Sequence, residues 1–447
     1  MATSKEMTAG PALPLILKFT LPLLLGNLLQ QTYSLVDAAI VGKFLGINAL
    51  ASVGASTSVV FLILGFCNGC CGGFGIPVAQ KFGARDYSTM RSYISVSLKL
   101  SVVMSVTIAI VTSILCADIL QMMRTPENIF EGAYAYLLVT FIGVPFTFFY
   151  NLLSSIIRAL GDSKTPFWFL LLSTVLNIVL DLFCILVLGW GVAGAAIATV
   201  ISQGLSAVLC YIYMYRKFDI LQSTPKERRF QSKLAKTLLY IGVPMGLQFS
   251  ITAIGSIMLQ SANNALGTAC VAAFTSAMRI KMFFICTFES LGIAMATYSG
   301  QNYGAGKKKR VRNSYLISLA YSFGIGLILG ASLVVFGRPF LSLFTRDAAV
   351  MDAGMYRLAI MGFSYCISAF MDCTIAAARA LGKSIVPMFI VIMGSCVFRV
   401  IWVYTVFAYF HTIPSLYLLY MFSWSITAVA EILYFIRIYR QKMALLS

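Results

Sequence analysis

The sequence predicts an all-α polytopic membrane protein, whose twelve transmembrane helices form two six-helix bundles related by an internal parallel repeat. Two observations predict this fold class. Hydrophobic residues make up 60% of the 447-residue chain and charged residues only 11%, whereas soluble domains carry roughly 25% charged residues. In addition, short strings of the first half recur in the second half at one constant offset, which is typical of transporters built from repeats.

The repeat is visible in three strings. AQKFGA, which contains Gln80, recurs as GQNYGA, which contains Gln301. The string RALG begins at Arg158 and again at Arg379, and Leu-Gly at 45–46 recurs at 266–267. Each match alone is weak, but collinear matches at one offset indicate a duplicated half. Pro22 and Pro244 lie one residue further apart along the chain than the other matched pairs, such as Gln80 and Gln301. One residue was therefore gained or lost between the copies.

Apolar stretches of about 20 residues, long enough to cross a bilayer, recur along the whole chain. Backbone groups in lipid must pair internally, so these stretches are expected to be helices. They are residues 13–40, 50–79, 93–116, 131–157, 166–188, 192–215, 237–262, 270–299, 313–337, 354–378, 387–410 and 415–436. Six precede a basic loop and six follow it. We therefore predict an N-terminal lobe at 1–215, a cytoplasmic linker at 216–236 and a C-terminal lobe at 237–447.

The net charge of +18 does not indicate nucleic-acid binding, because the basic residues gather in loops on one side of the predicted membrane. The linker, the loop after residue 306 and the tail after residue 436 hold most of them. This is the positive-inside pattern, and it predicts a membrane protein with both termini cytoplasmic. Membrane lipids are the expected partners, and some of these cations are also candidates for binding anionic head groups.

Other protein classes lack their signatures. No signal-peptide cleavage site is evident, and GQNYGAGKKK has the wrong glycine spacing for a nucleotide-binding loop. No hydrolase motif occurs, and the single histidine, His411, falls in a predicted external loop. We therefore expect a protein that is not an enzyme, that uses no cofactor and that has no obligate protein partner. Without a nucleotide site, such a protein is expected to run on an ion gradient, H⁺ or Na⁺, or to open passively.

Three cysteines in one predicted helix resemble a metal cluster, but their setting favours packing. Cys67, Cys70 and Cys71 lie among Gly65, Gly69 and Gly73 in an apolar span. Glycines at four-residue spacing let two helices approach closely.

The N-terminal half contains a candidate cation site. An ionisable group inside a span costs about 3 kcal/mol on insertion scales and is usually functional. Asp37 and Asp181 lie towards the outer ends of the first and fifth spans, each four residues after a polar side chain, Tyr33 and Asn177. Burial and a second carboxylate both favour the protonated form of a carboxyl group, so the pair suits a proton or Na⁺. Other residues expected near the same cavity are Gln30, Asn151 and Thr199.

The C-terminal half does not duplicate this pair. Phe398 and Trp402 stand where the repeat offset places the counterparts of Asn177 and Asp181, with Arg399 between them. Its own intramembrane charges, expected to contact substrate or to compensate one another, are Arg279, Lys281, Glu289, Asp372 and Arg399. The two halves are therefore predicted to differ in function, with ion coupling in the first half and substrate contact or closure in the second.

Together, these motifs resemble those of the MATE (multidrug and toxic compound extrusion) transporters, over nearly the whole chain. The resemblance rests on LVDAAIVGKFLG around Asp37, on the duplicated Gln-x-x-Gly-Ala and RALG strings, and on the Asn177–Asp181 pair. It implies two six-helix lobes, and it implies extrusion of organic, often cationic, compounds against H⁺ or Na⁺. The bacterial branch with an N-lobe aspartate pair is the most similar, and it implies that Asp37, Asn177, Asp181 and Thr199 bind the proton or Na⁺.

The sequence thus predicts a secondary antiporter that exports small, amphipathic, cationic organic molecules by alternating access. A flippase for a lipid-linked precursor is the alternative, since Arg279, Lys281 and Arg399 suit a pyrophosphate.

Overall fold

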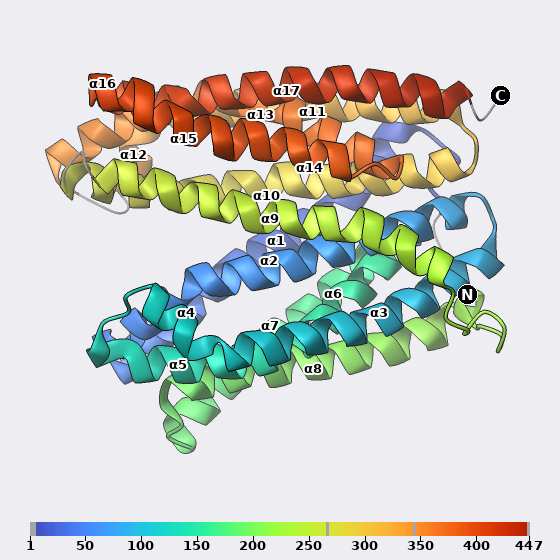
Figure 1. The fold of residues 1–447 in the computed structure, drawn as a ribbon, viewed down its shortest axis with the longest axis horizontal. Helices are drawn as coiled ribbons and strands as arrows, with labels where there is room; N and C mark the ends of the chain where they lie inside the picture. The colour runs from blue at the N-terminus through green and yellow to red at the C-terminus, as the bar shows by residue number, and fades with distance from the viewer. Residues whose placement is uncertain (1–5, 265–267, 343–345, 445–447) are drawn as a thin grey trace. The chain divides into compact units, whose positions relative to one another are not determined.

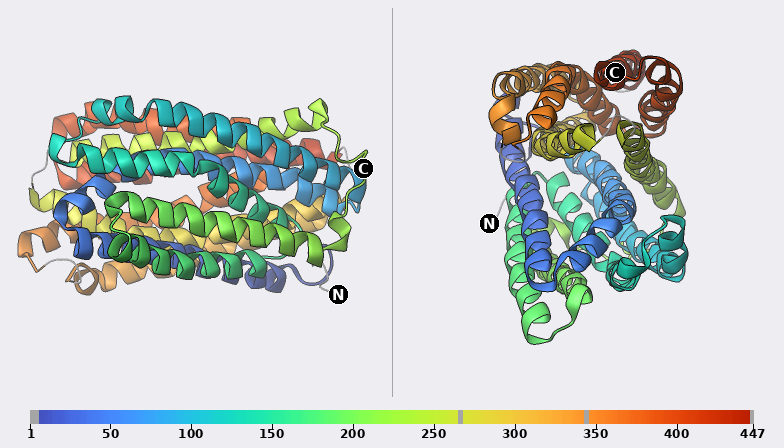
Figure 2. Two further views of the ribbon diagram at one scale, coloured as in Figure 1. Left: turned by 90° about the horizontal axis from the view of Figure 1, so that it is seen from below. Right: turned by 90° about the vertical axis from the view of Figure 1, so that its left-hand side faces the viewer.

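The computed structural model describes residues 6–264, 268–342 and 346–444, and within these ranges the chain is helical without strands (Figure 1). Side chains of many residues between 253 and 284 also lie outside the description, Arg279 and Lys281 among them. The predicted all-α class is confirmed. In the right-hand view of Figure 2, several long helices of the second unit are seen nearly end-on, because their axes are roughly parallel or antiparallel to one another.

Packing divides the chain into two compact units. The first unit is Met1–Glu6 with Leu25–Gly246, and the second unit is Met7–Leu24 with Leu247–Ser447. Two of these boundaries, after Leu24 and after Gly246, fall inside long helices, α1 (Ala12–Leu45) and α9 (Ser232–Asn264). The sequence interpretation instead separates the lobes in the linker at 216–236.

The other elements of the first unit follow in chain order. They are α2 (Ile47–Gly83), α3 (Tyr87–Ile114), α4 (Cys116–Met122), α5 (Glu127–Ile142), α6 (Val144–Ala159), α7 (Lys164–Leu182), the π-helical turn η1 (Phe183–Val187), α8 (Gly191–Lys217) and the 3₁₀ turn η2 (Asp219–Leu221). Its core gathers side chains of α2, α3, α6 and α8. Leu234, Ala235 and Leu238 join this core from the first half of α9.

The second unit is built from α10 onwards. Its elements are α10 (Thr268–Gly304), α11 (Lys308–Val335), α12 (Gly337–Ser342), α13 (Ala348–Ala380), α14 (Ile385–Ile392), η3 (Met393–Val397), α15 (Phe398–Trp402), η4 (Val403–Phe407), α16 (Ala408–Phe410) and α17 (Ile413–Ala444). α13 is its central helix and packs against α10, α11 and α17. The elements from α14 to α16 continue one another, so Ile385–Phe410 forms one span with two π-helical turns.

The helices account for the predicted spans. Within the described residues, ten are long and apolar enough to cross a membrane. α5 and α6, bent by 47° at Gly143, make one further span, which corresponds to the stretch predicted at 131–157. α10 corresponds to the stretch at 270–299.

The repeat extends to backbone conformation. Gly161 and Gly382, which end the two RALG strings, have φ angles of 84° and 77°. A side chain is strained at such angles and glycine is not, so the same turn requires the same residue in both halves.

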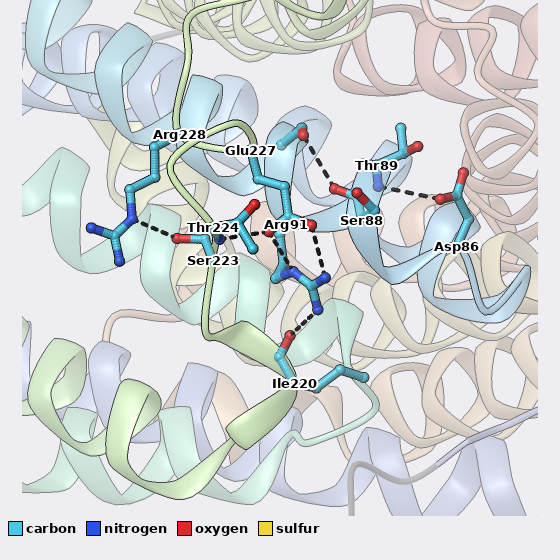
Figure 3. Close-up of polar contacts among 10 residues, drawn as sticks. Asp86, Ser88, Thr89, Arg91, Ile220, Ser223, Thr224, Glu227 and Arg228 are labelled. Carbon is cyan, nitrogen blue, oxygen red and sulfur yellow. Dashed lines mark hydrogen bonds and ion pairs between the residues drawn. The ribbon is translucent and has the colours of Figure 1, made fainter.

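Two short segments that precede long helices dock onto other helices of their own unit. The segment before α1 contacts α10 and α11, and the segment before α9 contacts α3. Residues 7–10, before α1, lie within the second unit, where Lys307 Nζ donates to the Thr8 carbonyl at 2.8 Å and Arg310 Nη1 donates to the Gly10 carbonyl at 2.7 Å. The linker before α9 lies within the first unit, where Arg91 of α3 forms a bidentate ion pair with Glu227 at 2.9 and 2.8 Å (Figure 3).

Glycines allow the closest helix contacts in each unit, as the spacing in α2 predicts. A Cβ on Gly73 of α2 would lie 2.5 Å from Gly242 Cα, and one on Gly69 would lie 2.7 Å from Gly246 Cα, both in α9. In the second unit, a Cβ on Gly330 of α11 would lie 2.1 Å from the carbonyl oxygen of Gly362 in α13.

Candidate functional site

Three helices of the first unit bring the predicted cation-binding residues together. The second half of α1 carries Tyr33 and Asp37, α7 carries Asn177 and Asp181, and α8 carries Thr199. In each pair the two residues are four positions apart, so they lie on one face of their helix. α8 begins Gly-Val-Ala-Gly-Ala-Ala, and such small side chains let neighbouring helices approach closely.

Thr199 links the other two helices through its hydroxyl. Asn177 Nδ2 donates to Thr199 Oγ1 at 3.0 Å, and Thr199 Oγ1 donates to the Ala195 carbonyl at 3.1 Å. A threonine hydroxyl has one proton and two lone pairs. The contact of 3.0 Å with Tyr33 is therefore a bond that the tyrosine hydroxyl donates.

The acids beside this hydroxyl are buried and leave their oxygens unused. Asp37 is 8% exposed, Asn177 2% and Asp181 0%. Within the described residues, Asp37 Oδ1, Asn177 Oδ1 and both carboxyl oxygens of Asp181 have no hydrogen-bond partner. The two carboxyl groups interact electrostatically with each other. A cluster of buried oxygens that lacks donors is suited to take up a proton or a hard cation.

The backbone changes pitch directly after Asp181. α7 ends at Leu182 and continues as η1, a single π-helical turn. Such turns are rare and often occur at functional sites. Two residues of the same helix, Cys184 and Ile185, remain buried beyond the acid.

The remaining first-half candidates do not join this cluster. Gln30 is exposed on α1, and Asn151 on α6 makes no hydrogen bond to the cluster within the described chain. Tyr136 of α5 is the residue that sequence reasoning missed, since it interacts electrostatically with both Asp37 and Asp181. A tyrosine in an apolar span is a common feature, so its sequence alone gave no signal.

The predicted site residues of the second unit do not form one cluster in the described chain, because each lies among different neighbours. Arg399 of α15 is buried, lies 4.7 Å from the centre of the Tyr420 ring and donates to Ser423 Oγ at 3.3 Å. Asp372 of α13 lines a small cavity with Ser318 and Ser322 of α11. Glu289 of α10 is exposed. Arg279 and Lys281 lie outside the described side chains, so their part in a charge network stays a prediction.

Two further charged residues of the second unit were not singled out from the sequence. Glu431 of α17 is fully buried, and Arg379, the arginine of the second RALG string, donates from Nη2 to Gln248 Oε1 at 2.6 Å. The sequence signal for Glu431 is a lone acid in the apolar run ITAVAEILYF.

Cysteines pack in the core of the first unit. Cys67, Cys70 and Cys71 are fully buried, and Cys71 Sγ lies 3.5 Å from the Phe148 carbonyl. Within the described part of the chain, no group of three or more histidine, cysteine or acidic side chains is arranged to hold a metal ion.

Comparison with known proteins identifies the family. The MatE family model matches residues 22–183 and 241–405, which is most of both halves of the repeat. The chain belongs to the MATE family. It is therefore a multi-pass membrane transporter of a multidrug efflux family rather than an enzyme.

Individual relatives agree with this assignment. The probable multidrug resistance protein YoeA of Bacillus subtilis is 30% identical over 385 residues, which cover 84% of this chain and 83% of YoeA. The probable multidrug resistance protein YpnP of the same organism is 30% identical over 360 residues, which cover 80% of each chain. A solved outward-facing multidrug resistance MATE transporter of the MOP superfamily matches with a TM-score of 0.90 at 25% identity, covering 100% of this chain and 99% of that one.

Proposed function

We propose that this MATE transporter is a secondary active antiporter, which exports small, amphipathic, cationic organic compounds in exchange for H⁺ or Na⁺ by alternating access. The observation that carries the proposal is the buried pair of Asp37 and Asp181, in which Asp37 Oδ1 and both carboxyl oxygens of Asp181 lack hydrogen-bond partners in the described chain. The proposal places the protein in the bacterial plasma membrane, in keeping with its Bacillus subtilis relatives. Both termini are proposed to be cytoplasmic, as the distribution of basic residues predicts.

The site suits exchange because the same carboxylate oxygens can attract a cationic substrate and, at another step, bind the coupling proton or Na⁺. A cationic substrate is attracted to the two carboxylates when they are charged. Uptake of protons or Na⁺ neutralises them, and the substrate then loses its electrostatic attraction. Binding drives a conformational change only through different affinities for the two states. Asn177 and Thr199 position the oxygens around the pair.

Helix α1 is the element through which this binding acts. Asp37 lies in its second half, whereas Met7–Leu24 packs with the second unit, with Ile16 and Phe19 buried there. Pro22 lies within the helix next to that boundary and removes a backbone hydrogen bond, which permits a kink. A shift of Asp37 on cation binding is therefore expected to bend α1 near this position.

The test is gradient-driven extrusion of a fluorescent cationic dye from drug-sensitive bacteria. Wild type is compared with Asp37→Asn, Asp181→Asn and the control Asp118→Asn, an exposed acid on α4. We expect loss of extrusion in the first two variants only. The proton and Na⁺ gradients are collapsed separately, and the collapse that stops the wild type identifies the ion. Undiminished extrusion in both site variants would contradict the proposal.

The flippase remains the second candidate because buried Arg399 suits an anionic head group. Absence of dye extrusion by a well-expressed wild type, together with movement of a lipid pyrophosphate in proteoliposomes, would favour it.

A further inference from the structure

The second unit contains a buried acid that lacks hydrogen-bond partners. Glu431 lies in the middle of α17 and is 0% exposed. Within the described residues, neither of its carboxyl oxygens has a hydrogen-bond partner. A charged carboxylate is expensive to bury without hydrogen bonds, so this arrangement suits the neutral, protonated acid.

A half-buried arginine, whose buried Nε has no hydrogen-bond partner within the described residues, lies near it. Arg379, at the end of α13, donates from Nη2 to Gln248 Oε1 of α9 at 2.6 Å, while its Nε has no partner within the described residues. It interacts electrostatically with Glu431, and α13 packs along α17. The two side chains nevertheless form none of the close ion pairs found in the described chain.

Other charged and titratable groups that face α17 are engaged elsewhere. Arg399 of α15 contacts Tyr420 and Ser423, and Ser423 precedes Glu431 by roughly 12 Å of helix. Tyr315 of α11 shares a hydrogen bond of 2.9 Å with Thr374. Asp372 of α13 also interacts electrostatically with Arg379. The elements α14 and η3 carry no charged residue.

Two arrangements of this group follow from the chemistry. Arginine stays charged in proteins and prefers a bidentate bond to a carboxylate over a single bond to a neutral amide. The structure shows the first arrangement, in which Arg379 is held by Gln248, and this arrangement suits a protonated Glu431. Once Glu431 loses its proton, the carboxylate competes for the guanidinium.

We propose that Glu431 is a proton-binding site of the second unit, and that its protonation decides whether Arg379 is held by Gln248 or by Glu431 itself. Gln248 lies on α9 two positions after Gly246, the last residue of the first unit. Proton release at Glu431 therefore frees α9 from α13 close to the point where the helix passes from one unit to the other. This switch goes beyond the antiport proposed above, and its test requires no transport.

The test measures protonation of Glu431 directly. A hydrophobic carbodiimide modifies protonated carboxyl groups in apolar surroundings, and peptide mass spectrometry quantifies its adduct on Glu431. The full-length protein in lipid nanodiscs is treated over a pH series. Four variants accompany wild type: Arg379→Gln, Arg379→Lys, Gln248→Ala and Asp181→Asn.

Modification of Glu431 is expected to fall as the pH rises. Arg379→Gln removes the cation that favours the charged acid, so the midpoint should move up by about one pH unit or more. Gln248→Ala frees Arg379 for Glu431, so the midpoint should move down. Arg379→Lys retains the charge and should move it less than Arg379→Gln does.

Three results would overturn the proposal. One is modification of wild-type Glu431 at every pH or at none. Another is a shift in the same direction for Arg379→Gln and Gln248→Ala. If Arg379→Gln does not fold, an unchanged or raised midpoint in Gln248→Ala overturns it by itself. Asp181→Asn should leave the midpoint at Glu431 unchanged whether or not it transports, so failure of the antiport and failure of this switch are distinguishable.

Discussion

The polar interiors of the two units differ although the units are copies of one another. In the first unit, Asn177 and Asp181 present oxygens to a cluster shared by three helices. At the matched positions of the second unit, Phe398 and Trp402 lie with their rings 5.8 Å apart, and Trp402 Nε1 donates to the Ser415 carbonyl at 2.7 Å. The comparison teaches that duplication preserved the turns and the helix order, whereas the buried chemistry diverged.

The largest expected effect tests that divergence at one matched pair of positions. Asp181→Asn should lower gradient-driven efflux by about tenfold or more, because it removes a carboxylate of the proposed ion site, and even groups one shell away from a bound metal ion usually contribute about that much. Trp402→Phe, which preserves an apolar ring at the matched position of the second unit, should retain most of the activity. Efflux rates normalised to protein in the membrane measure both. Equal losses in the two variants would show that the halves share the coupling chemistry.

A second comparison concerns the helix contacts that both units build on glycine. Gly73→Ala and Gly330→Ala each place a methyl group against backbone of a neighbouring helix, and such overpacking costs about 1–3 kcal/mol. Gly54→Ala and Gly324→Ala are the controls, because a Cβ at either position meets nothing within 4 Å. Thermal unfolding of the purified variants should show a lower midpoint for the first pair only. An equally lowered midpoint in the controls would show that the loss of stability does not arise from the close contact with a neighbouring helix.

The fold could be predicted from the sequence because the features that indicate it lie within single helices and turns. Apolar length defines the spans, and the glycines of the RALG strings mark turns that no other residue adopts without strain. Four-residue spacing places Tyr33 with Asp37 and Asn177 with Asp181 on one face of their helices, whereas the meeting of these faces with Thr199 depends on the packing of three helices. The assignment of Asp37, Asn177, Asp181 and Thr199 to ion coupling stays a prediction.

Other features depend on packing between distant segments, which spacing along one helix does not reveal. Tyr136 interacts with the acids from α5, a helix that packs against α2 and α8. Gln30 is exposed although it is one turn from Tyr33. Residues 7–24 join the second unit through buried Ile16 and Phe19, which read in the sequence as ordinary parts of the first span. Glu431 stands alone among apolar residues, so its importance emerges only once Arg379 is seen beside it.

A smaller effect on efflux is expected from removing the Thr199 hydroxyl in the first unit. Thr199→Val preserves the shape of the side chain but removes the oxygen that accepts from Asn177 and Tyr33. Each buried donor left without a partner costs about 1–3 kcal/mol, so we expect efflux to fall severalfold and to recover in Thr199→Ser. Dye efflux at several concentrations of the coupling ion measures the effect. A loss in Thr199→Val that Thr199→Ser does not restore would contradict a role for the hydroxyl.

The smallest expected effect concerns the two docked segments, the linker before α9 and residues 7–10. The linker of the first unit is held by an ion pair, whereas residues 7–10 of the second unit are held by cations that donate to backbone carbonyls. Hydrogen bonds from Arg91 lower the pKa of Glu227 to about 2, against an ordinary value of 4.5. A carboxyl group whose pKa is lowered by docking stabilises the docked state fully above its ordinary pKa and loses that contribution as the pH falls through the lower value.

Acidification from about pH 5 towards pH 2 should therefore loosen residues 223–229 while residues 7–10 stay docked. Amide hydrogen exchange of the two segments, corrected for the intrinsic rate at each pH, measures this difference. Glu227→Gln should give the loosened linker already at neutral pH and should remove most of its pH dependence, because the substituted side chain no longer titrates. Glu131→Gln, which changes an acid of α5 outside the docked linker, is the matched control. Parallel loosening of both segments in wild type would show that acid opens the protein as a whole rather than the linker contact.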